Sequence, residues 1–302
     1  MQLTVEHLAG LFPEPLASDS KYTRGIVGLI TGSDEYPGAG VLSTCAAASC
    51  GAGYVRYSGP DRVVQTLLGL HPEVVFSASP DHRVDAWVLG SGYGGLYGAN
   101  DVRGTQIRHI LSHLDQAYAV VDAGALESFA TMELTPQQRS HCVITPHMGE
   151  AARLYTVLGE RVYADQLANN PEYAAAYMAR QLGCTVVLKG AQTVVACADG
   201  TSFVCPPATH RLATAGTGDV LAGLMGGMLA LHAQMIQAGE VELARVAAAA
   251  VCVHSYAAGL AAHDTEEMDE WLGRTRRSAH SHALNVLQMT EQIPAAIAVM
   301  SR

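Results

Sequence analysis

Aromatic residues are scarce in this sequence, at 6% of 302 positions, and charged residues make up only 15%. Basic residues are fewer than acidic ones, which gives a formal net charge of −10. This balance argues against binding to nucleic acid, because recognition of a phosphate backbone needs a basic face. Hydrophobic residues reach 49%, so Ala, Val and Leu can build a large core. The composition favours an extensive α/β domain over a disordered or disulfide-stapled chain.

Several diagnostic motifs are also missing. No CxxC pair occurs among the seven cysteines, whose odd number and apolar surroundings predict reduced, buried thiols in a cytosolic protein. No GxxxxGK[ST] segment occurs, which excludes a P-loop NTPase at the level of the motif. The first residues have neither a basic start nor a long apolar core, so we expect no signal peptide.

Two segments rich in alanine and glycine, residues 212–231 and 243–262, are long enough to resemble membrane spans. The first contains Asp219, and the second contains Arg245 and His254, each of which is costly inside lipid. We therefore expect two neighbouring helices that are buried within the protein and do not enter a membrane.

Short apolar runs alternate with Ala-rich helical stretches, which is the rhythm of a parallel sheet covered on both faces. The predicted strands are residues 28–31, 54–57, 74–76, 86–89, 119–121, 142–145 and 185–188. Residues 193–198 and 201–204 should form a late hairpin, because the Asp199-Gly200 pair between them suits a type I′ turn. Predicted helices are 41–49, 172–182, two within 212–263, and one from about 283, with a mobile polar loop at 264–281. Gly223, Gly226 and Gly227 should let the helix after residue 212 pack closely under the sheet.

Polar and glycine-rich stretches follow the predicted strands. Because ligands bind beyond the carboxyl ends of the strands in such sheets, these stretches should converge on one rim. They are GSDEYPGAG at 32–40, LGSGYGG at 89–95, DAGAL at 122–126, TPHMGE at 145–150, KGAQT at 189–193 and GTGD at 216–219.

The GTGD stretch combines glycines with a carboxylate at the start of a helix. Gly216 and Gly218 would leave backbone N–H groups open to a phosphate, and the helix dipole adds positive potential there. Asp219, held ionised by the same dipole, would accept a proton from a substrate hydroxyl while the N–H groups stabilise phosphoryl charge. The alternative is that Asp219 is only a helix-capping acid.

Together, GTGDVLAG, KGAQT and TPHMGE resemble the ADP-dependent NAD(P)H-hydrate dehydratase family of the ribokinase-like superfamily. The YPGAG-to-GAGYV block and LGSGYG are similar to that family as well, and the resemblance covers about residues 20–262 and, weakly, 283–294. It implies a ribokinase-like three-layer α/β/α sandwich with a mostly parallel central sheet and a late β-hairpin. We expect a single domain over residues 1–302.

The resemblance also implies a repair reaction in the cytoplasm. NADH or NADPH that carries a hydroxyl at C6 of the nicotinamide ring would be dehydrated at the expense of ADP, with Mg²⁺, releasing AMP and phosphate. The hydroxyl would be phosphorylated first, because phosphate leaves more readily than hydroxide and the adjacent ring nitrogen can expel it. Family habit implies a homo-oligomer such as a tetramer. Since only about twenty residues precede the match, an epimerase activity is expected on a separate protein.

The family's functional residues match positions in this sequence one by one. Asp219 matches the catalytic base, which also contacts the substrate. The nucleotide-binding matches are Lys189, Gly190, Ala191, Gln192, Thr193, Gly216, Thr217 and Gly218. The hydrate-binding matches are Ala39, Gly40, Gly92 and His147, and Glu150 would help to place Mg²⁺ through water. Where the family commonly has an acid, this sequence has Gly124, which leaves Asp122 as the acid of that loop.

Some of these residues have simpler interpretations. Lys189 would be a solvated cation at a strand end, His147 a histidine packed behind proline, and the glycines of 90–95 an ordinary turn. His109 and His113 are four apart, but no cysteine or carboxylate stands near them at ligand spacing, so we expect solvated histidines and no zinc.

Two other functions stay open on the sequence alone. An ATP-dependent kinase of the same superfamily, acting on a vitamin precursor, would leave a stable phosphorylated product. A non-catalytic nucleotide-binding regulator would keep the fold without turnover, although the intact GTGD stretch argues against it.

Overall fold

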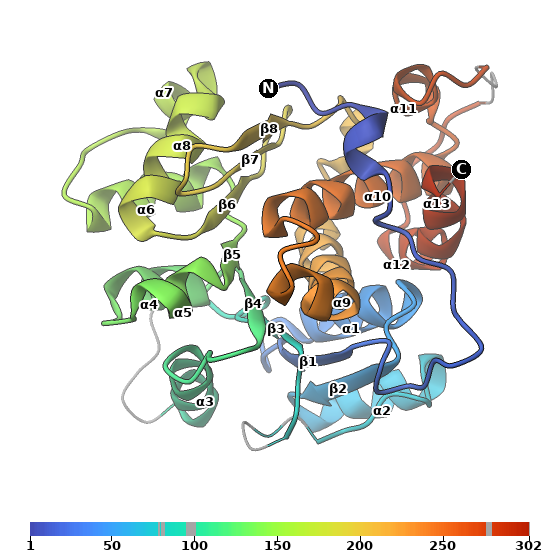
Figure 1. Cartoon of the computed structure of the whole chain (residues 1–302), viewed down its shortest axis with the longest axis horizontal. Helices are drawn as coiled ribbons and strands as arrows, with labels where there is room; N and C mark the ends of the chain where they lie inside the picture. The colour runs from blue at the N-terminus through green and yellow to red at the C-terminus, as the bar shows by residue number, and fades with distance from the viewer. Residues whose placement is uncertain (78, 80–81, 95–100, 276–279, 302) are drawn as a thin grey trace.

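One central sheet organises the protein (Figure 1). The computed structural model describes all residues except 78, 80–81, 95–100, 276–279 and 302. In this part the sheet has eight strands in the order β2-β1-β3-β4-β5-β6-β7-β8. Pairing is parallel from β2 to β6 and antiparallel from β6 to β8. The strands are β1 (Ile26–Ile30), β2 (Tyr54–Ser58), β3 (Ala86–Leu89), β4 (Tyr118–Val121), β5 (Cys142–Ile144), β6 (Thr185–Leu188), β7 (Val194–Ala196) and β8 (Ser202–Val204).

Helices cover both faces of the sheet. On one face lie α1 (Pro37–Ser49), α2 (Asp61–Leu70), α9 (Thr217–Gln237), α10 (Leu243–Ala262), α12 (Val286–Glu291) and α13 (Ile293–Met300). On the other face lie α3 (Val102–Leu111), α4 (Ala125–Thr131), α6 (Met148–Val157), α7 (Ala164–Asn169) and α8 (Pro171–Leu182). The short elements are η1 (Val5–Leu8), α5 (Pro136–Ser140), η2 (His210–Leu212) and α11 (Glu266–Trp271).

The central strands are buried on both sides, which divides the hydrophobic core into two layers. In β1, Val27 and Leu29 face the layer that contains α9, whereas Ile26 and Ile30 face the opposite layer. The same alternation continues along the parallel strands, as expected when helices cover both faces. The predicted three-layer α/β/α sandwich is confirmed. All seven cysteines are free thiols, and all but the half-buried Cys197 are buried.

The two helices α9 and α10 pass a membrane-span test by length and composition. They are nevertheless packed inside the protein, because 72% of the most apolar window of α9 and 83% of that of α10 are buried. Glycines make the packing of α9 close. A Cβ added to Gly226 would lie 2.2 Å from Val88 Cγ2 in β3, and one added to Gly223 would lie 1.9 Å from the Ser43 carbonyl oxygen in α1. The predicted close packing of α9 is confirmed.

Most predicted strands are confirmed within two residues, and β3 and β6 agree at both ends. The strand predicted at 74–76 is wrong, since only Val75 pairs with β2 there. The reason is local: the Ser77 N–H, which would be the next one to reach β2, donates to the Val75 carbonyl at 3.0 Å, so the ladder does not continue.

The predicted late hairpin, β7 to β8, is confirmed, but its turn is not type I′. That type needs positive φ at both central residues. Gly200 has φ 99°, whereas Asp199 is not among the residues with positive φ. The Gly200 N–H donates to the Cys197 carbonyl at 3.2 Å, and the Cys197 N–H donates to the Thr201 carbonyl at 2.8 Å. The loop is therefore longer than a two-residue turn.

The polar segment 264–281 is not wholly a loop, which corrects the prediction. It contains α11, whose Met268 is 2% exposed and packs into the core, so one apolar face orders the helix. Residues 276–279 of the segment lie outside the described part. The last helical region begins at Val286 instead of near 283, because the Asn285 side chain accepts hydrogen bonds from the first N–H groups of α12.

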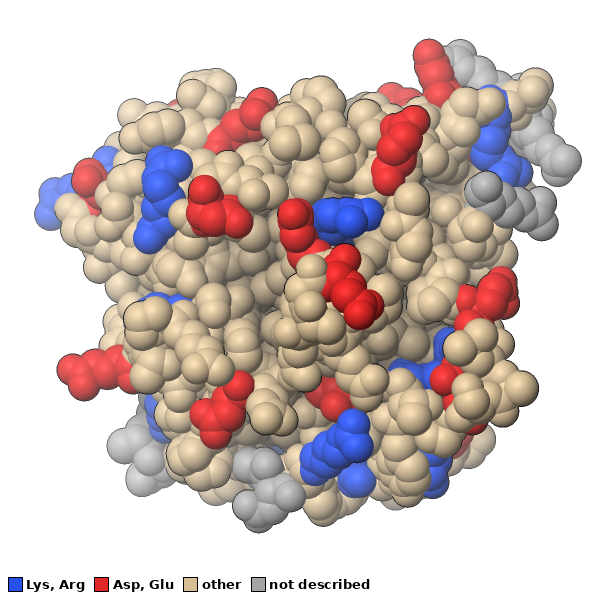
Figure 2. All heavy atoms as spheres, in the orientation of Figure 1, with Lys and Arg blue, Asp and Glu red and all other residues tan. Residues whose placement is uncertain are grey.

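Charges of both signs are scattered over the face shown in Figure 2. Acidic and basic side chains stand among larger areas of uncharged residues, and the described residues form no continuous basic surface on that face.

Candidate active site

The GTGD stretch forms the N-terminus of α9. Gly216 precedes the first helical residue and has φ 97°, a left-handed conformation that glycine adopts at little cost. The Thr217 hydroxyl lies 3.0 Å from the Leu212 carbonyl and 2.9 Å from the Thr214 carbonyl, which fixes the entry into the helix. N–H groups in the first turn, such as that of Gly218, have no partner within the helix. This is the geometry expected of an anion hole.

Lys189 brings a cation to the same place. A Cβ added to Gly218 would lie 3.4 Å from Lys189 Nζ, so the ammonium group adjoins the first turn of α9. Nζ also donates to Asp122 Oδ1 at 2.9 Å. Burial alone would lower the pKa of Lys189. The nearby carboxylates of Asp122, Glu150 and Asp219 outweigh this effect and raise the pKa above its ordinary value. The side chain is 19% exposed, so the interpretation as a solvated surface cation is wrong.

Asp219 lies beside this cation and is held by a second partner. The Ser91 hydroxyl, in the loop after β3, donates to Asp219 Oδ1. Burial raises the pKa of Asp219 to about 6, and the charges of Asp122 and Glu150 add to the rise. The hydrogen bond from Ser91 and the charge of Lys189 oppose it. The helix dipole was expected to hold Asp219 in its ionised form. Burial outweighs the stabilisation of the charge by the dipole, but with a pKa near 6 the ionised carboxylate is still the dominant form at pH 7.

His147 and Glu150 cap the N-terminus of α6. Nδ1 of His147 accepts hydrogen bonds from the N–H groups of Gly149 and Glu150 at 3.0 and 3.3 Å, and Glu150 Oε2 accepts from the His147 N–H at 2.8 Å. Because Nδ1 is an acceptor, the neutral ring carries its proton on Nε2. The His147 side chain is 56% exposed, so it is not simply packed behind Pro146.

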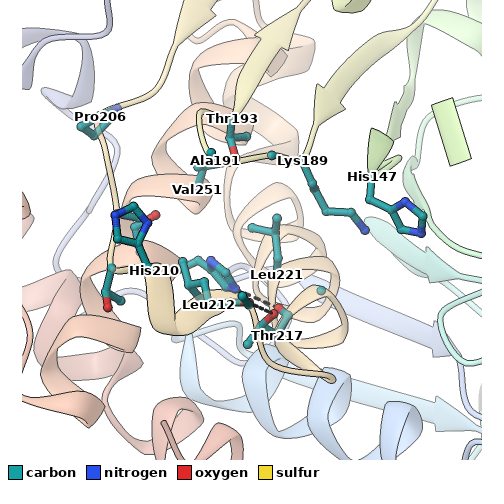
Figure 3. Close-up of a pocket in the computed structure, with 17 residues that line it drawn as sticks. His147, Lys189, Ala191, Thr193, Pro206, His210, Leu212, Thr217, Leu221 and Val251 are labelled. Atoms are coloured by element: carbon teal, nitrogen blue, oxygen red, sulfur yellow. Dashed lines mark hydrogen bonds between the residues drawn. The ribbon is translucent and has the colours of Figure 1, made fainter. Parts of the chain in front are cut away.

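A cavity of about 440 Å³ opens beside Lys189 and the start of α9 (Figure 3). Figure 3 shows Lys189 and His147 at one end and Pro206 and His210 at the other. Most of the predicted nucleotide-binding residues line it, namely Lys189, Gly190, Ala191, Thr193, Thr217 and Gly218. Gln192 and Gly216 belong to the same two loops but do not line the cavity. One hollow thus brings together the KGAQT and GTGD stretches.

His254 on α10 lines this cavity too, and sequence reasoning did not include it in the site. Its Nε2 donates to the Thr217 carbonyl at 2.8 Å, and the residue is 6% exposed. Burial lowers the pKa of His254 to about 4, so the ring is neutral near pH 7. That carbonyl and the Gly218 N–H belong to one peptide unit, so the imidazole helps to fix the direction of the N–H. The sequence signal that could have indicated His254 is the presence of a histidine within a long apolar helix.

Of the four predicted hydrate-binding residues, His147 lines this cavity, whereas Ala39, Gly40 and Gly92 are not part of its lining. A Cβ added to Gly92 would lie 2.5 Å from Ala39 Cβ, which brings the loop after β3 against α1. Ala39 and Gly40 lie in the first turn of α1, because the helix begins at Pro37 and not near Val41 as predicted. Proline has the fixed φ that suits the first helical position. These residues do not line the cavity of Figure 3; of the predicted LGSGYGG loop, residue 95 lies outside the described part.

The described residues provide no ready-made metal cage, since no group of three or more His, Cys, Asp or Glu side chains is placed to hold an ion. Asp122 Oδ1 is already occupied by Lys189 and by the Thr145 hydroxyl at 2.7 Å. Glu150 has one oxygen engaged by the His147 N–H. Such residues fit Mg²⁺ that is carried mainly by phosphate oxygens and water, as this ion prefers.

The histidine pair considered for zinc has another explanation. His113 lies beyond the end of α3, its Nδ1 is 2.8 Å from the His109 carbonyl, and the two rings contact each other at a tilt of 34°, with centroids 4.2 Å apart. No metal grouping of described residues includes them.

Comparison with known sequences assigns the chain to a family. The profile of the NAD(P)H-hydrate dehydratases matches residues 27–271. The chain belongs to this family. The ADP-dependent (S)-NAD(P)H-hydrate dehydratase of Neisseria meningitidis is 34% identical over 269 residues, which cover 85% of this chain and 88% of that relative. The enzyme of the same name from Bacillus subtilis is 30% identical over 235 residues, covering 76% and 81%.

Some family members are much longer. The bifunctional NAD(P)H-hydrate repair enzyme Nnr of Mycobacterium leprae is 36% identical over 281 residues, which cover 92% of this chain and 54% of that protein. The chain therefore spans about half the length of the bifunctional relatives it matches. Among solved structures, the ADP/ATP-dependent NAD(P)H-hydrate dehydratase of Bacillus subtilis, co-crystallised with ATP/Mg²⁺, superposes with a TM-score of 0.78 at 25% identity, covering 99% of this chain and 98% of that one. An Enterococcus faecalis ribokinase-like superfamily protein gives 0.75, with 99% and 96% covered, so the predicted ribokinase-like fold is confirmed.

Proposed function

We propose that this chain catalyses the ADP-dependent dehydration of (6S)-NAD(P)H-hydrate to NAD(P)H, with release of AMP and phosphate. Membership in the NAD(P)H-hydrate dehydratase family supports the substrate class. The observation that carries the proposal is a juxtaposition: the Asp219 carboxylate and the Lys189 ammonium group both adjoin the N-terminus of α9, next to a cavity of about 440 Å³.

In the first step the nucleotide occupies the cavity with its terminal phosphoryl group toward Lys189. The ammonium group and the N–H of Gly218 stabilise the charge that develops on the phosphoryl oxygens, because preorganised donors need no rearrangement during the reaction. Asp219 takes the proton from the C6 hydroxyl as the hydroxyl oxygen attacks the terminal phosphorus of ADP. The products of this step are AMP and a phosphorylated hydrate. A base with a pKa of about 6 is well suited to this role near neutral pH.

In the second step the C6–O bond breaks and phosphate leaves with the bonding electrons. The lone pair of the ring nitrogen assists its departure, and loss of a proton from the neighbouring ring carbon restores the double bond. Lys189 remains beside the departing phosphate, so the same cation serves both steps. Mg²⁺, when bound, would neutralise part of the phosphate charge, with Glu150 holding one of its water ligands.

The assignment is tested by incubating the chain with ADP, Mg²⁺ and hydrated NADH and following the absorbance of restored NADH. We expect recovery that requires ADP and stops when the hydrate is consumed. Absence of ADP-dependent recovery would contradict the proposal. Use of ATP with accumulation of a stable phosphorylated compound would instead favour a small-molecule kinase.

Several properties of the whole protein also belong to the proposal. We expect the reaction to take place in the cytoplasm, in a homo-oligomer such as a tetramer. We retain a single domain over residues 1–302 as a prediction.

A further inference from the structure

Among the described side chains, that of Ser91 hydrogen-bonds directly to the Asp219 carboxylate, and it comes from a distant part of the chain. The two residues are 128 positions apart, one in the loop after β3 and one in the first turn of α9. Ser91 is 0% exposed, so its hydroxyl cannot exchange this partner for bulk water. A buried hydroxyl of this kind is expected to stay bonded.

The loop that carries Ser91 has little freedom to move. Gly90 and Gly92 on either side have φ of 95° and 81°, which few other residues adopt. The Gly32 N–H donates to the Ser91 carbonyl at 2.8 Å, and the Gly90 N–H donates to the Ile30 carbonyl at 3.1 Å. The close approach of Gly92 to α1 fixes the loop from its other side. The position of the Ser91 hydroxyl is therefore fixed by the loop that carries it.

We propose that Ser91 is a positioning residue that orients the Asp219 carboxylate for proton transfer. Its hydroxyl commits Oδ1 to the protein and leaves Oδ2 for the substrate hydroxyl. It also favours the ionised form, because a hydrogen bond donated to a carboxylate stabilises the charge. This inference rests on the proposed function for the identity of the proton donor, but the contact between Ser91 and Asp219 does not.

The other charged groups around Asp219 cannot replace this effect. Asp122 at the end of β4 and Glu150 on α6 both disfavour a negative charge on Asp219. Lys189 favours it, but its ammonium group is already engaged by Asp122 at 2.9 Å. Without the Ser91 hydroxyl, burial and the two carboxylates would still disfavour a negative charge on Asp219. Only the Lys189 cation, which is shared with Asp122, would then favour that charge.

The test compares Ser91→Ala with Ser91→Cys and with Ser128→Ala. Ser128 on α4 is a buried serine outside the site, so its substitution controls for removal of a buried hydroxyl. We expect kcat of Ser91→Ala to fall about tenfold near pH 6 and only about twofold near pH 8, because its base is protonated over a wider range. Ser91→Cys, a weak donor of similar size, should give an intermediate profile. An equal loss at all pH values, or no loss, would overturn the proposal.

A second readout does not depend on turnover. With ¹³C-labelled aspartate, the side-chain carboxyl signal of residue 219 can be assigned by its absence from Asp219→Asn and titrated by NMR. We expect its midpoint to move to higher pH in Ser91→Ala but not in Ser128→Ala. An unchanged midpoint would overturn the positioning role, even if the chain turned over. A shifted midpoint in a chain without ADP-dependent activity would support the contact and contradict only the proposed function.

Discussion

Replacement of Asp219 by asparagine is the sharpest single perturbation of the site, since it keeps the shape of the side chain and an oxygen for Ser91. With a pKa of about 6, kcat/KM of the unmodified chain should fall about tenfold for each pH unit below that value. General-base catalysis contributes about 10²–10⁴-fold, so Asp219→Asn should lose that factor at pH 7, equivalent to about 3–5 kcal/mol. The remaining activity should not follow the acid limb, because the titrating group is gone.

The same substitution should stabilise the folded chain. The folded-state pKa of Asp219 is raised from 3.8 to about 6, so ionisation destabilises the fold progressively between these values and fully above them. The shift corresponds to about 3 kcal/mol, of which solvent screening at a partly exposed residue leaves on the order of 1–2 kcal/mol. The amide removes this penalty. The midpoint of thermal unfolding at pH 8 should therefore rise by a few degrees.

Turnover of hydrated NADH with ADP, measured between pH 5 and pH 8, and calorimetric unfolding are the two assays. Asp165→Asn is the matched control, because Asp165 is an exposed acid in the first turn of α7. We expect it to change neither rate nor stability appreciably. Retention of full rate by Asp219→Asn would refute the reasoning about the base, and a lower unfolding temperature would refute the reasoning about burial.

Substitutions at three other positions have expected outcomes. Lys189→Met should raise the KM for ADP about tenfold or more and lower the free energy of unfolding by about 3–5 kcal/mol, because it leaves Asp122 as a buried unpaired charge. Lys189→Arg should show smaller changes in both quantities. Titration with ADP measures the KM, and thermal unfolding measures the stability. Gly226→Ala should lower stability by about 1–3 kcal/mol in chemical denaturation, because the added methyl group overlaps a β3 side chain. His254→Leu should reduce kcat about three- to tenfold, and His254→Gln less, because only glutamine retains an N–H for the Thr217 carbonyl.

The fold could be predicted where local sequence and burial agree. Ala86–Leu89 and Thr185–Leu188 are apolar runs buried on both faces, so their limits follow from hydrophobicity alone. Residues 74–76 have a similar composition, but the Ser77 N–H that would continue the ladder donates to the Val75 carbonyl instead. Pro37 belongs to a glycine-rich stretch that resembles a loop, yet it begins α1, because the helix gains its stability from burial of later residues.

The parts of the site that consist of consecutive residues could be predicted from the sequence, but the contacts between residues far apart in the chain could not. The GTGD and KGAQT stretches contain the signals for a helix N-terminus and a strand end, and the cavity brings them together. Ser91 and His254 reach Asp219 and Thr217 across 128 and 37 positions, so no local pattern indicates these pairs. Burial likewise decides the pKa of Asp219, and depth cannot be inferred from a sequence spacing.

In the proposed mechanism the oxygen of the substrate hydroxyl attacks ADP before it leaves the ring. Hydrated NADH prepared with heavy oxygen in its C6 hydroxyl tests this directly, by mass spectrometry of the released phosphate after ADP-dependent turnover. We expect one heavy oxygen in each phosphate formed, because the C6–O bond breaks after the new P–O bond has formed. Unlabelled phosphate, with the heavy oxygen in water, would contradict it.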